Sequence, residues 1–270
     1  MSLKEVLEHI HRDISPVIII HGKKGTGKTD FSLYLAEKML EYGYVELVAT
    51  NVKTESFPVI DTLGKLRLWL ASSTKKKLFV FDEAGVYITA RRSMSKANVE
   101  ILKLAHLLRK YRAKMIFTTV RYKDIDASLK DPEICSAIVE KKAKTIAEIT
   151  VLTGEPETYI LTNIPRTSIN FDTYDIAYFD FEREYEVTED MPDWLKALEI
   201  FAREGNYRAI CEELGFTNVS SAKHLLRKGI RNALNLIFQS IYNLQFEALA
   251  PSSSNLINVN KNLQEVDVVG

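Results

Sequence analysis

The fold of this chain is decided by Gly22-Lys23-Lys24-Gly25-Thr26-Gly27-Lys28-Thr29, which satisfies the pattern G-x-x-x-x-G-K-[S/T] at every required position. The residues before it, from Pro16 to His21, form an apolar run that predicts a buried strand. The residues after it, from Thr29 to about Tyr42, carry apolar side chains at helical spacing. A strand, a glycine-rich loop and a helix form the context in which this motif binds phosphate, and a chance glycine-rich turn lacks that context.

The motif assigns a chemical role to each part of the loop. Its glycines let backbone N–H groups close around phosphate oxygens, and the following helix directs the positive end of its dipole at them. Lys28 is placed to contact the β- and γ-phosphates, and the Thr29 hydroxyl is placed to bind Mg²⁺. We therefore predict that residues 22–29 bind MgATP, although the sequence contains no motif that distinguishes adenine from guanine.

A second motif follows 54 positions after Lys28. The apolar run Lys77–Phe81 predicts another buried strand, and it ends on Asp82-Glu83. An aspartate at this position, known as Walker B, holds Mg²⁺, and the adjacent glutamate polarises a water molecule for attack on the γ-phosphate. Two carboxylates that merely cap a strand end are the alternative. With Asp82 as a metal-binding residue and Glu83 as the catalytic one, the motif predicts hydrolysis of ATP to ADP and phosphate.

Strand and helix signals alternate through the first two-thirds of the chain, which is typical of a parallel sheet covered by helices. We predict an α/β fold in residues 1–171, with three more short strand-like pieces completing the sheet and its edge. The predicted strands are 44–50, 77–81, 115–120, 136–139, 146–152 and 158–161, and the predicted helices are 58–72 and 97–112.

Several polar residues near the second motif are candidates for the catalytic machinery. Thr118 and Thr119 end a predicted strand, where related ATPases place a sensor of the γ-phosphate, and we take Thr119 as the sensor; threonine is also an ordinary strand residue. An arginine donated by a neighbouring subunit often stabilises transition-state charge. The candidates for this arginine finger, each of which can instead be a surface residue, are Arg109, Arg112 and Arg121.

Charge is segregated along the chain although the formal net charge is zero. Ten basic residues and a single acidic one, Glu100, occupy positions 91–123. Such a block can be a solvated helix face, a subunit interface or a track for the phosphate backbone of double-stranded DNA, and we favour the last. The ten residues are Arg91, Arg92, Lys96, Lys103, Arg109, Lys110, Arg112, Lys114, Arg121 and Lys123.

The overall composition is that of a globular protein, since 46% of the residues are hydrophobic. The two cysteines, Cys135 and Cys211, lie far apart, which argues against a disulfide framework or a zinc site. No stretch approaches the length of a membrane span, and the N-terminus predicts an amphipathic helix without a signal peptide. We therefore expect a cytoplasmic protein without a membrane partner, in the host cytoplasm if it is viral.

The composition changes after residue 171. Residues 172–193 contain nine acidic residues and one basic residue, Arg183. A charged linker repels itself and stays extended, so we expect an acidic connector that holds a second domain off the first. Residues 194–250 then predict an all-helical domain, and residues 251–270 predict a mobile polar tail.

Within the helical domain, residues 194–202 and 207–214 predict two helices, and Asn218 is the expected N-cap of a third helix. Helix, glycine-containing turn and helix form the pattern of a helix-turn-helix, here winged-helix-like, whose second helix enters the major groove. A plain packing or oligomerisation module is the alternative. The expected DNA-binding residues are Ser220, Ser221, Lys223 and His224 at base edges, and Arg227, Lys228 and Arg231 at phosphates.

The segment from Leu108 to Arg121, followed by Lys123-Asp-Ile-Asp126 and Leu129, resembles the same region of HerA–FtsK-like ATPases. These proteins belong to the additional-strand, catalytic-glutamate division of P-loop NTPases and include Zot-like proteins and the packaging ATPases of archaeal viruses and plasmids. The similarity covers about Ser15–Val139. Those motors commonly end the strand after Walker B with a Gln, where this chain has Thr119 or Val120.

The resemblance implies a DNA-translocating or DNA-remodelling motor of a virus or plasmid that acts as a homo-oligomer, such as a hexameric ring. Three alternatives stay open. One is a DnaA- or Orc-like AAA+ replication initiator, which would also carry a C-terminal DNA-binding domain. The second is a regulator that uses ATP as a switch, and the third is a scaffold ATPase that does not act on DNA.

Overall fold

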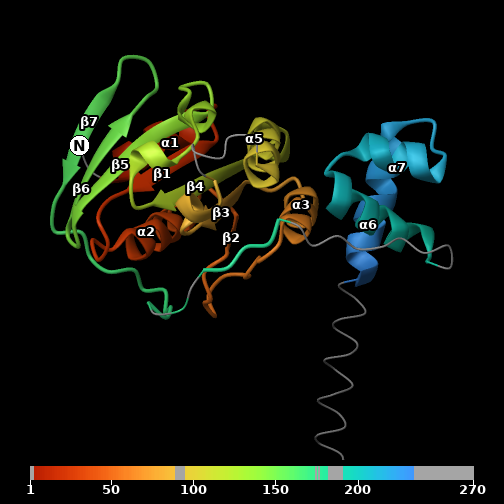
Figure 1. Cartoon of the computed structure of the whole chain (residues 1–270), viewed down its shortest axis with the longest axis horizontal. Coiled ribbons are helices and arrows are strands. Elements are labelled where there is room, and N and C mark those ends of the chain that lie inside the picture. Colours follow the sequence, from red (N-terminus) through yellow and green to blue (C-terminus); the bar gives the residue numbers. More distant parts are fainter. Residues whose placement is uncertain (1–2, 89–94, 174, 176, 182–190, 234–270) are drawn as a thin grey trace, which may run out of the picture.

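A computed structural model describes residues 3–88, 95–173, 175, 177–181 and 191–233 of the chain (Figure 1). Its strands are β1 (Val17–His21), β2 (Leu47–Thr50), β3 (Lys77–Phe81), β4 (Ala113–Thr119), β5 (Cys135–Ala143), β6 (Ile146–Val151) and β7 (Glu157–Leu161). Its α-helices are α1 (Leu3–Arg12), α2 (Lys28–Glu41), α3 (Leu63–Ala71), α4 (Ala84–Tyr87), α5 (Lys96–Leu108), α6 (Asp193–Glu204) and α7 (Tyr207–Leu214). Short 3₁₀ helices are η2 (Arg109–Tyr111), η3 (Tyr122–Asp124) and η4 (Ala127–Lys130), and a further helix occupies residues 219–233.

Seven strands form one sheet in the order β2-β3-β4-β1-β5-β6-β7. The strands from β2 to β5 are parallel, and β4 lies between β1, which leads into the glycine-rich loop, and β3, which leads into Asp82. An inserted strand between those two strands defines the additional-strand division of P-loop NTPases, so this part of the prediction is confirmed.

The sheet is not parallel throughout. β6 pairs antiparallel with β5, and β7 pairs antiparallel with β6. Only Lys144 and Thr145 separate β5 from β6, and a connection of two residues can join antiparallel neighbours but not parallel ones. The three short strand-like pieces therefore complete the edge of the sheet as predicted, but as a meander.

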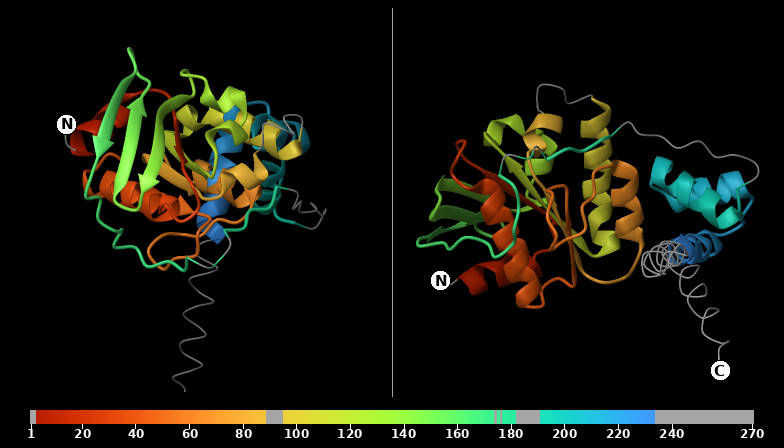
Figure 2. Two further views of the ribbon diagram at one scale, coloured as in Figure 1. Left: turned by 60° about the vertical axis from the view of Figure 1, so that its left-hand side comes forward. Right: turned by 90° about the horizontal axis from the view of Figure 1, so that it is seen from below.

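Helices cover both faces of the sheet (Figures 1 and 2). α1 and α2 pack on the face that carries Ile18, Ile20 and Val80, and α3 and α5 pack on the face that carries Ile19 and Phe79. Because both faces of β1 are covered, its residues 17–20 are all buried, as the apolar run predicts.

The predicted helix 58–72 starts five residues late, at Leu63. Residues before it are extended, with Val59 bridged to Thr50 at the end of β2. Thr62 then caps α3, because its hydroxyl oxygen accepts a hydrogen bond from the backbone N–H of Lys65. The helical spacing of the leucines led to a helix being predicted for residues 58–62 as well, but these residues precede α3 and include the bridge to β2.

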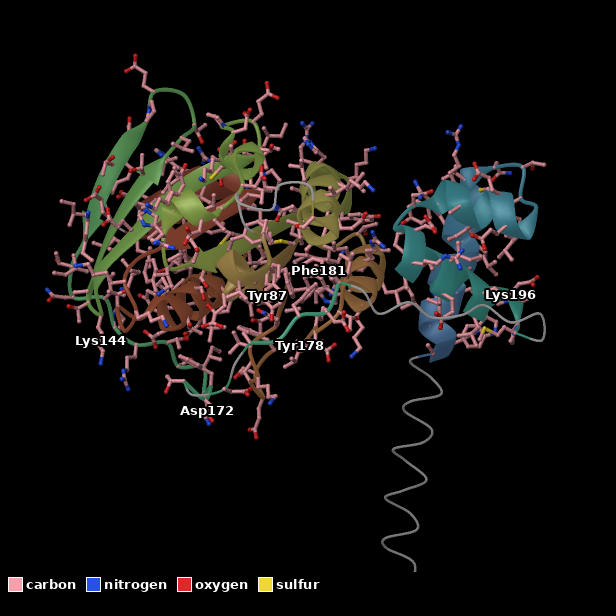
Figure 3. The ribbon with its side chains drawn as sticks, in the orientation of Figure 1. Tyr87, Lys144, Asp172, Tyr178, Phe181 and Lys196 are labelled. Atoms are coloured by element: carbon pink, nitrogen blue, oxygen red, sulfur yellow. The ribbon has the colours of Figure 1, made fainter. Side chains whose placement is uncertain are left out.

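The start of the predicted acidic connector belongs to the core. Phe179 is buried, and Asp180 exchanges backbone hydrogen bonds with the segment before α3, at 2.7 Å to Asp61 and 3.0 Å from Leu63. Figure 3 places Tyr87 and Phe181 together, and their rings lie 5.9 Å apart. The prediction that this whole segment stays extended and free is therefore wrong for residues 177–181, because apolar side chains between the acidic ones anchor it. Residues 182–190 lie outside the described residues.

The C-terminal helices are docked on the core rather than held away from it. α6, α7 and residues 219–233 share a small hydrophobic core with Leu68 and Ala71 of α3 (Figures 1 and 2). Arg67 of α3 is buried, donates a hydrogen bond of 2.9 Å to the carbonyl of Ala202 at the end of α6, and pairs with Glu100 of α5. The expectation of a detached domain is therefore wrong. The predicted mobile tail and the end of the helical domain, from residue 234, lie outside the described residues.

Candidate nucleotide-binding site

The glycine-rich loop follows β1 at the carboxyl edge of the sheet and bends tightly. A Cβ at Gly22 would lie 2.5 Å from the carbonyl oxygen of Lys141, so only glycine fits there. Gly27, with φ of 78°, is in the left-handed region and serves as the N-cap of α2 without a side chain. Like α4 and α6, α2 has no side-chain cap, so its first N–H groups are available to an anion at the end of the glycine-rich loop.

Hydrogen-bond donors of the loop converge on one oxygen. The carbonyl of Lys23 accepts from Lys28 Nζ at 3.2 Å and from the Thr26 hydroxyl at 2.8 Å. Burial lowers the pKa of Lys28, and the nearby carboxylates of Asp82 and Glu83 act in the opposite direction. A loop with several donors around one point and a partly desolvated ammonium group is suited to a phosphate group.

Asp82 connects the loop to the neighbouring strands. Its Oδ2 accepts a hydrogen bond of 2.8 Å from the Thr29 hydroxyl, and its Oδ1 accepts one of 2.6 Å from the Thr118 hydroxyl. Its backbone N–H and carbonyl both bond the amide of Asn51, at 2.7 and 3.2 Å. Thr29 lies on α2, Asp82 directly follows β3, and Thr118 lies on β4, so the fold brings residues from three segments to one point.

The Asp82 carboxylate is suited to Mg²⁺. Burial raises the pKa of Asp82, and hydrogen bonds from Thr118 and Thr29 oppose that rise. In the described residues, the groups that donate hydrogen bonds to this carboxylate are two hydroxyls, and Lys28 acts on it only through its charge. This leaves a set of hard oxygen donors. The described residues contain no group of three or more His, Cys, Asp or Glu that could hold a metal ion. Mg²⁺ would therefore depend on Thr29, Asp82 and the phosphates together.

Glu83 is held in an uncommon backbone conformation. Its φ is 54°, in the left-handed region that non-glycine residues rarely adopt. Its backbone N–H donates a 2.9 Å hydrogen bond to the Thr118 hydroxyl, and its side chain is exposed at the carboxyl edge of the sheet. Thr118 therefore positions both acidic residues of the motif, because its hydroxyl contacts the carboxylate of one and the backbone of the other.

The predicted sensor does not join this cluster. Alternation along β4 puts Thr119 on the opposite face from Thr118, and its hydroxyl donates to the carbonyl of Arg121 at 3.3 Å. Asn51 and Thr118 take part in the cluster instead. The sequence did contain a signal for both residues. Thr118 is the penultimate residue of β4, and Asn51 is the polar residue directly after β2. The carboxyl ends of parallel strands meet at one edge of the sheet, so polar residues at these positions are candidates for the site.

The three candidate arginines do not lie together. Arg121 follows β4 at the carboxyl edge and pairs with Asp124 at 2.9 Å. Arg109 and Arg112 precede β4 and line a pocket at the amino edge, where the backbone N–H of Lys77 bonds the carbonyl of Arg112. Of the three, Arg121 alone lies at the same edge of its own subunit as the glycine-rich loop.

The basic block does not form the continuous track that its sequence suggests. Lys114 is directed inward, to the carbonyls of Asp13 and Ser15 at 2.9 Å each, whereas Arg121 and Lys123 are on the opposite edge of the sheet. The block is contiguous in sequence, but it runs along α5 and then through β4, which separates its ends. Arg91 and Arg92 lie outside the described residues.

The helix at residues 219–233 exposes most of its predicted DNA contacts. Asn218 caps it as predicted, since its Oδ1 accepts a 2.9 Å hydrogen bond from the backbone N–H of Ser221. Ala222 and Leu226 face the small core. Ser221 also donates its hydroxyl to Asn218 at 3.1 Å, which engages it in the cap. The exposed residues are Ser220, Lys223, His224, Arg227, Lys228 and Arg231.

Together, the additional strand β4, the uncapped α2 terminus and the Thr29–Asp82 contact define the class: the chain has the fold and the site of a P-loop NTPase. No family model matches the chain. It is 26% identical over 110 residues to the uncharacterised protein B-251 of Sulfolobus spindle-shape virus 1, across 40% of this chain and 44% of that protein. The chain thus spans less than half the length of this curated relative.

Solved structures with similar folds include the genome-packaging NTPase B204 of Sulfolobus turreted icosahedral virus 2 in complex with ATPγS. The two are 12% identical with a TM-score of 0.43, and the match covers 57% of this chain and 100% of B204. The N-terminal domain of zonular occludens toxin from Neisseria meningitidis is 15% identical with a TM-score of 0.40, over 56% and 95% of the two chains. No helix within the described residues is long and apolar enough to cross a membrane.

Proposed function

We propose that this chain is a DNA-associated ATPase that hydrolyses MgATP to ADP and phosphate, as a motor of a virus or plasmid. The observation that carries the proposal is the hydrogen-bonded cluster of Thr29, Asp82 and Thr118 beside the glycine-rich loop, with Glu83 directly after it. A site for nucleotide binding alone needs the loop and a metal ligand. A carboxylate in a strained backbone conformation at the same edge suits hydrolysis.

Each residue has a task in this reaction. Lys28 and the N–H groups of the loop bind the phosphates, and Thr29 and Asp82 hold Mg²⁺, which neutralises charge on the phosphate oxygens when bound. Glu83 accepts a hydrogen bond from a water molecule and so orients that water for attack on the γ-phosphorus. Thr118 fixes the direction of Glu83, because it anchors the backbone N–H of that residue.

DNA association is supported by the exposed face of residues 219–233, which carries Lys223, Arg227, Lys228 and Arg231. Cations on the exposed face of one helix bind phosphates without sequence preference. The curated relative is a viral protein, which supports a role in a virus or plasmid. We also propose an oligomer, because Arg109 and Arg112 lie away from the loop of their own subunit and suit donation to a neighbour as an arginine finger.

The structure favours the motor over a DnaA- or Orc-like initiator in one respect. After β5 the chain continues the sheet through β6 and β7. The backbone N–H of Ile164 then donates a 3.0 Å hydrogen bond to the carbonyl of Thr145, in the turn between β5 and β6. An AAA+ protein would place a helical lid at this point. We therefore keep the motor as the proposed function.

A Lys28→Ala variant is expected to lose both nucleotide binding and hydrolysis, because the lysine contacts the two phosphates whose charge changes in the reaction. We expect at least about a hundredfold loss of turnover. The measurement is release of phosphate from MgATP together with binding of a fluorescent ATP analogue. Lys4→Ala, at the exposed start of α1, is the control and should retain both. Full hydrolysis by the Lys28→Ala variant would rule out the proposed mechanism.

A further inference from the structure

A pocket lined by basic side chains lies at the amino edge of the sheet, opposite the nucleotide site. Its volume is about 180 Å³, and it lies between the end of α1, the starts of β3 and β4, and η2. Neither the nucleotide site nor the expected DNA-binding helix accounts for it. Its basic residues are His11, Lys76, Lys77, Arg109, Arg112 and Lys114.

The positive charge of the pocket is poorly compensated. Asp13 is the acidic residue in its lining; it accepts hydrogen bonds from the Ser15 N–H and the Thr153 hydroxyl, and its charge offsets part of that of Lys114. Lys77 and Lys114 donate to backbone carbonyls rather than to carboxylates. Carbonyl oxygens satisfy the hydrogen bonds of an ammonium group, but they do not neutralise its charge.

Burial is the main cost at the two buried ammonium groups of the pocket, and Asp13 offsets part of it at Lys114. Burial lowers the pKa of Lys77 and of Lys114 to about 8 each. Arg112 and Arg227 lower the pKa of Lys77 further, and Glu46 acts in the opposite direction. A bound anion would offset both desolvation and repulsion, so the pocket has its most favourable electrostatics when an anion occupies it.

The helix at residues 219–233 extends this positive surface. Its buried residues Ala222 and Leu226 share a hydrophobic cluster with Tyr111, which ends η2 next to Arg112. Arg227 is exposed on the same helix and is close enough to act electrostatically on Lys77. The docked helix therefore adds its own cation to those of the pocket, and the positive surface spans the core and the helical unit.

We propose that the pocket and Arg227 together form one groove, the amino-edge groove, that binds the phosphodiester backbone of DNA. This inference rests on the proposed DNA association and names the surface that carries it. A nucleic-acid strand fits better than a single phosphate because the cations come from three segments: the start of β3, η2 with the start of β4, and Arg227 on the C-terminal helix.

The test compares Lys76→Glu, Arg227→Glu and the double variant with Lys4→Glu, an equal charge change at the exposed start of α1. Affinity for a fluorescein-labelled duplex is measured by anisotropy over a range of salt concentrations. Each single groove variant should weaken binding regardless of sequence and reduce the slope of log affinity against log salt by about one, and the double variant should reduce it by about two. Lys4→Glu should stay near wild type. Binding of a fluorescent ATP analogue confirms that each variant is folded.

Three results would overturn the proposal. If Lys76→Glu behaves like Lys4→Glu while the wild type binds DNA, the groove is wrong and the proposed function stands. If inorganic phosphate binds the wild type but duplex affinity is equal in all variants, the pocket is a site for a small anion. If the wild type binds no duplex even at low salt, the DNA association fails together with the groove.

Discussion

A Glu83→Gln variant is expected to bind MgATP as the wild type does and to hydrolyse it about 10²- to 10⁴-fold more slowly. Glutamine keeps the size of the side chain but accepts a proton far less well, so the attacking water loses its polarising group. The backbone conformation should persist, since the Thr118 hydroxyl holds the N–H of residue 83 rather than its side chain. Single-turnover hydrolysis and equilibrium ATP binding separate the two effects.

Glu133→Gln, an equal change at an exposed position at the other end of the sheet, serves as the control and should leave both quantities unaltered. A Glu83→Gln variant with wild-type turnover would show that another group activates the water. Weakened ATP binding in that variant, with unchanged single-turnover chemistry, would instead place Glu83 in nucleotide binding alone.

The second large effect is expected at Arg67, where substitution by Met should release the C-terminal helices from the core. The guanidinium group holds two carbonyls at the end of α6 and the Glu100 carboxylate, and it is almost completely buried. Removing one partner of a buried ion pair costs about 3–5 kcal/mol, although Lys103 still contacts Glu100 here. We expect faster amide exchange in α6 and α7 while β1 and β3 stay protected.

Lys65→Met, two residues away on the same helix, removes an exposed pair with Asp61 and should change stability by less than about 1 kcal/mol. If Arg67→Met and Lys65→Met show the same exchange in α6, the helical unit is held by its hydrophobic contacts alone. If exchange rises equally in β3 and α6 of the Arg67→Met variant, the two parts unfold as a single unit.

The sequence was most informative where one local pattern determines one local structure. The glycine-rich loop requires its strand and its helix, and Asp82-Glu83 requires an apolar strand before it, so these elements were predicted within one or two residues. The Asn218 cap was predicted for the same reason, since a cap concerns only its own helix. Interactions between residues that are close in the sequence can therefore be predicted from the sequence alone.

Features that depend on distant segments were missed. Charge alone predicted an extended connector, but Phe179 and Asp180 bind the core through an aromatic cluster and a pairing with residues 61–63. The sequence alone does not separate Thr118 from Thr119, because which of the two faces Asp82 depends on how β4 pairs with its neighbours. The basic block is continuous in sequence but not in space. Strand β4 runs through it from one edge of the sheet to the other, so the two ends of the block lie at opposite edges.

ATP hydrolysis at residues 22–29 and 82–83 is proposed to be coupled to DNA. The most direct test is the rate of MgATP hydrolysis as a function of duplex length at low salt, with the oligomeric state measured in the same samples. We expect the rate to rise with duplex length until the oligomer is saturated. Hydrolysis that is the same with and without duplex, at every length, would contradict this claim.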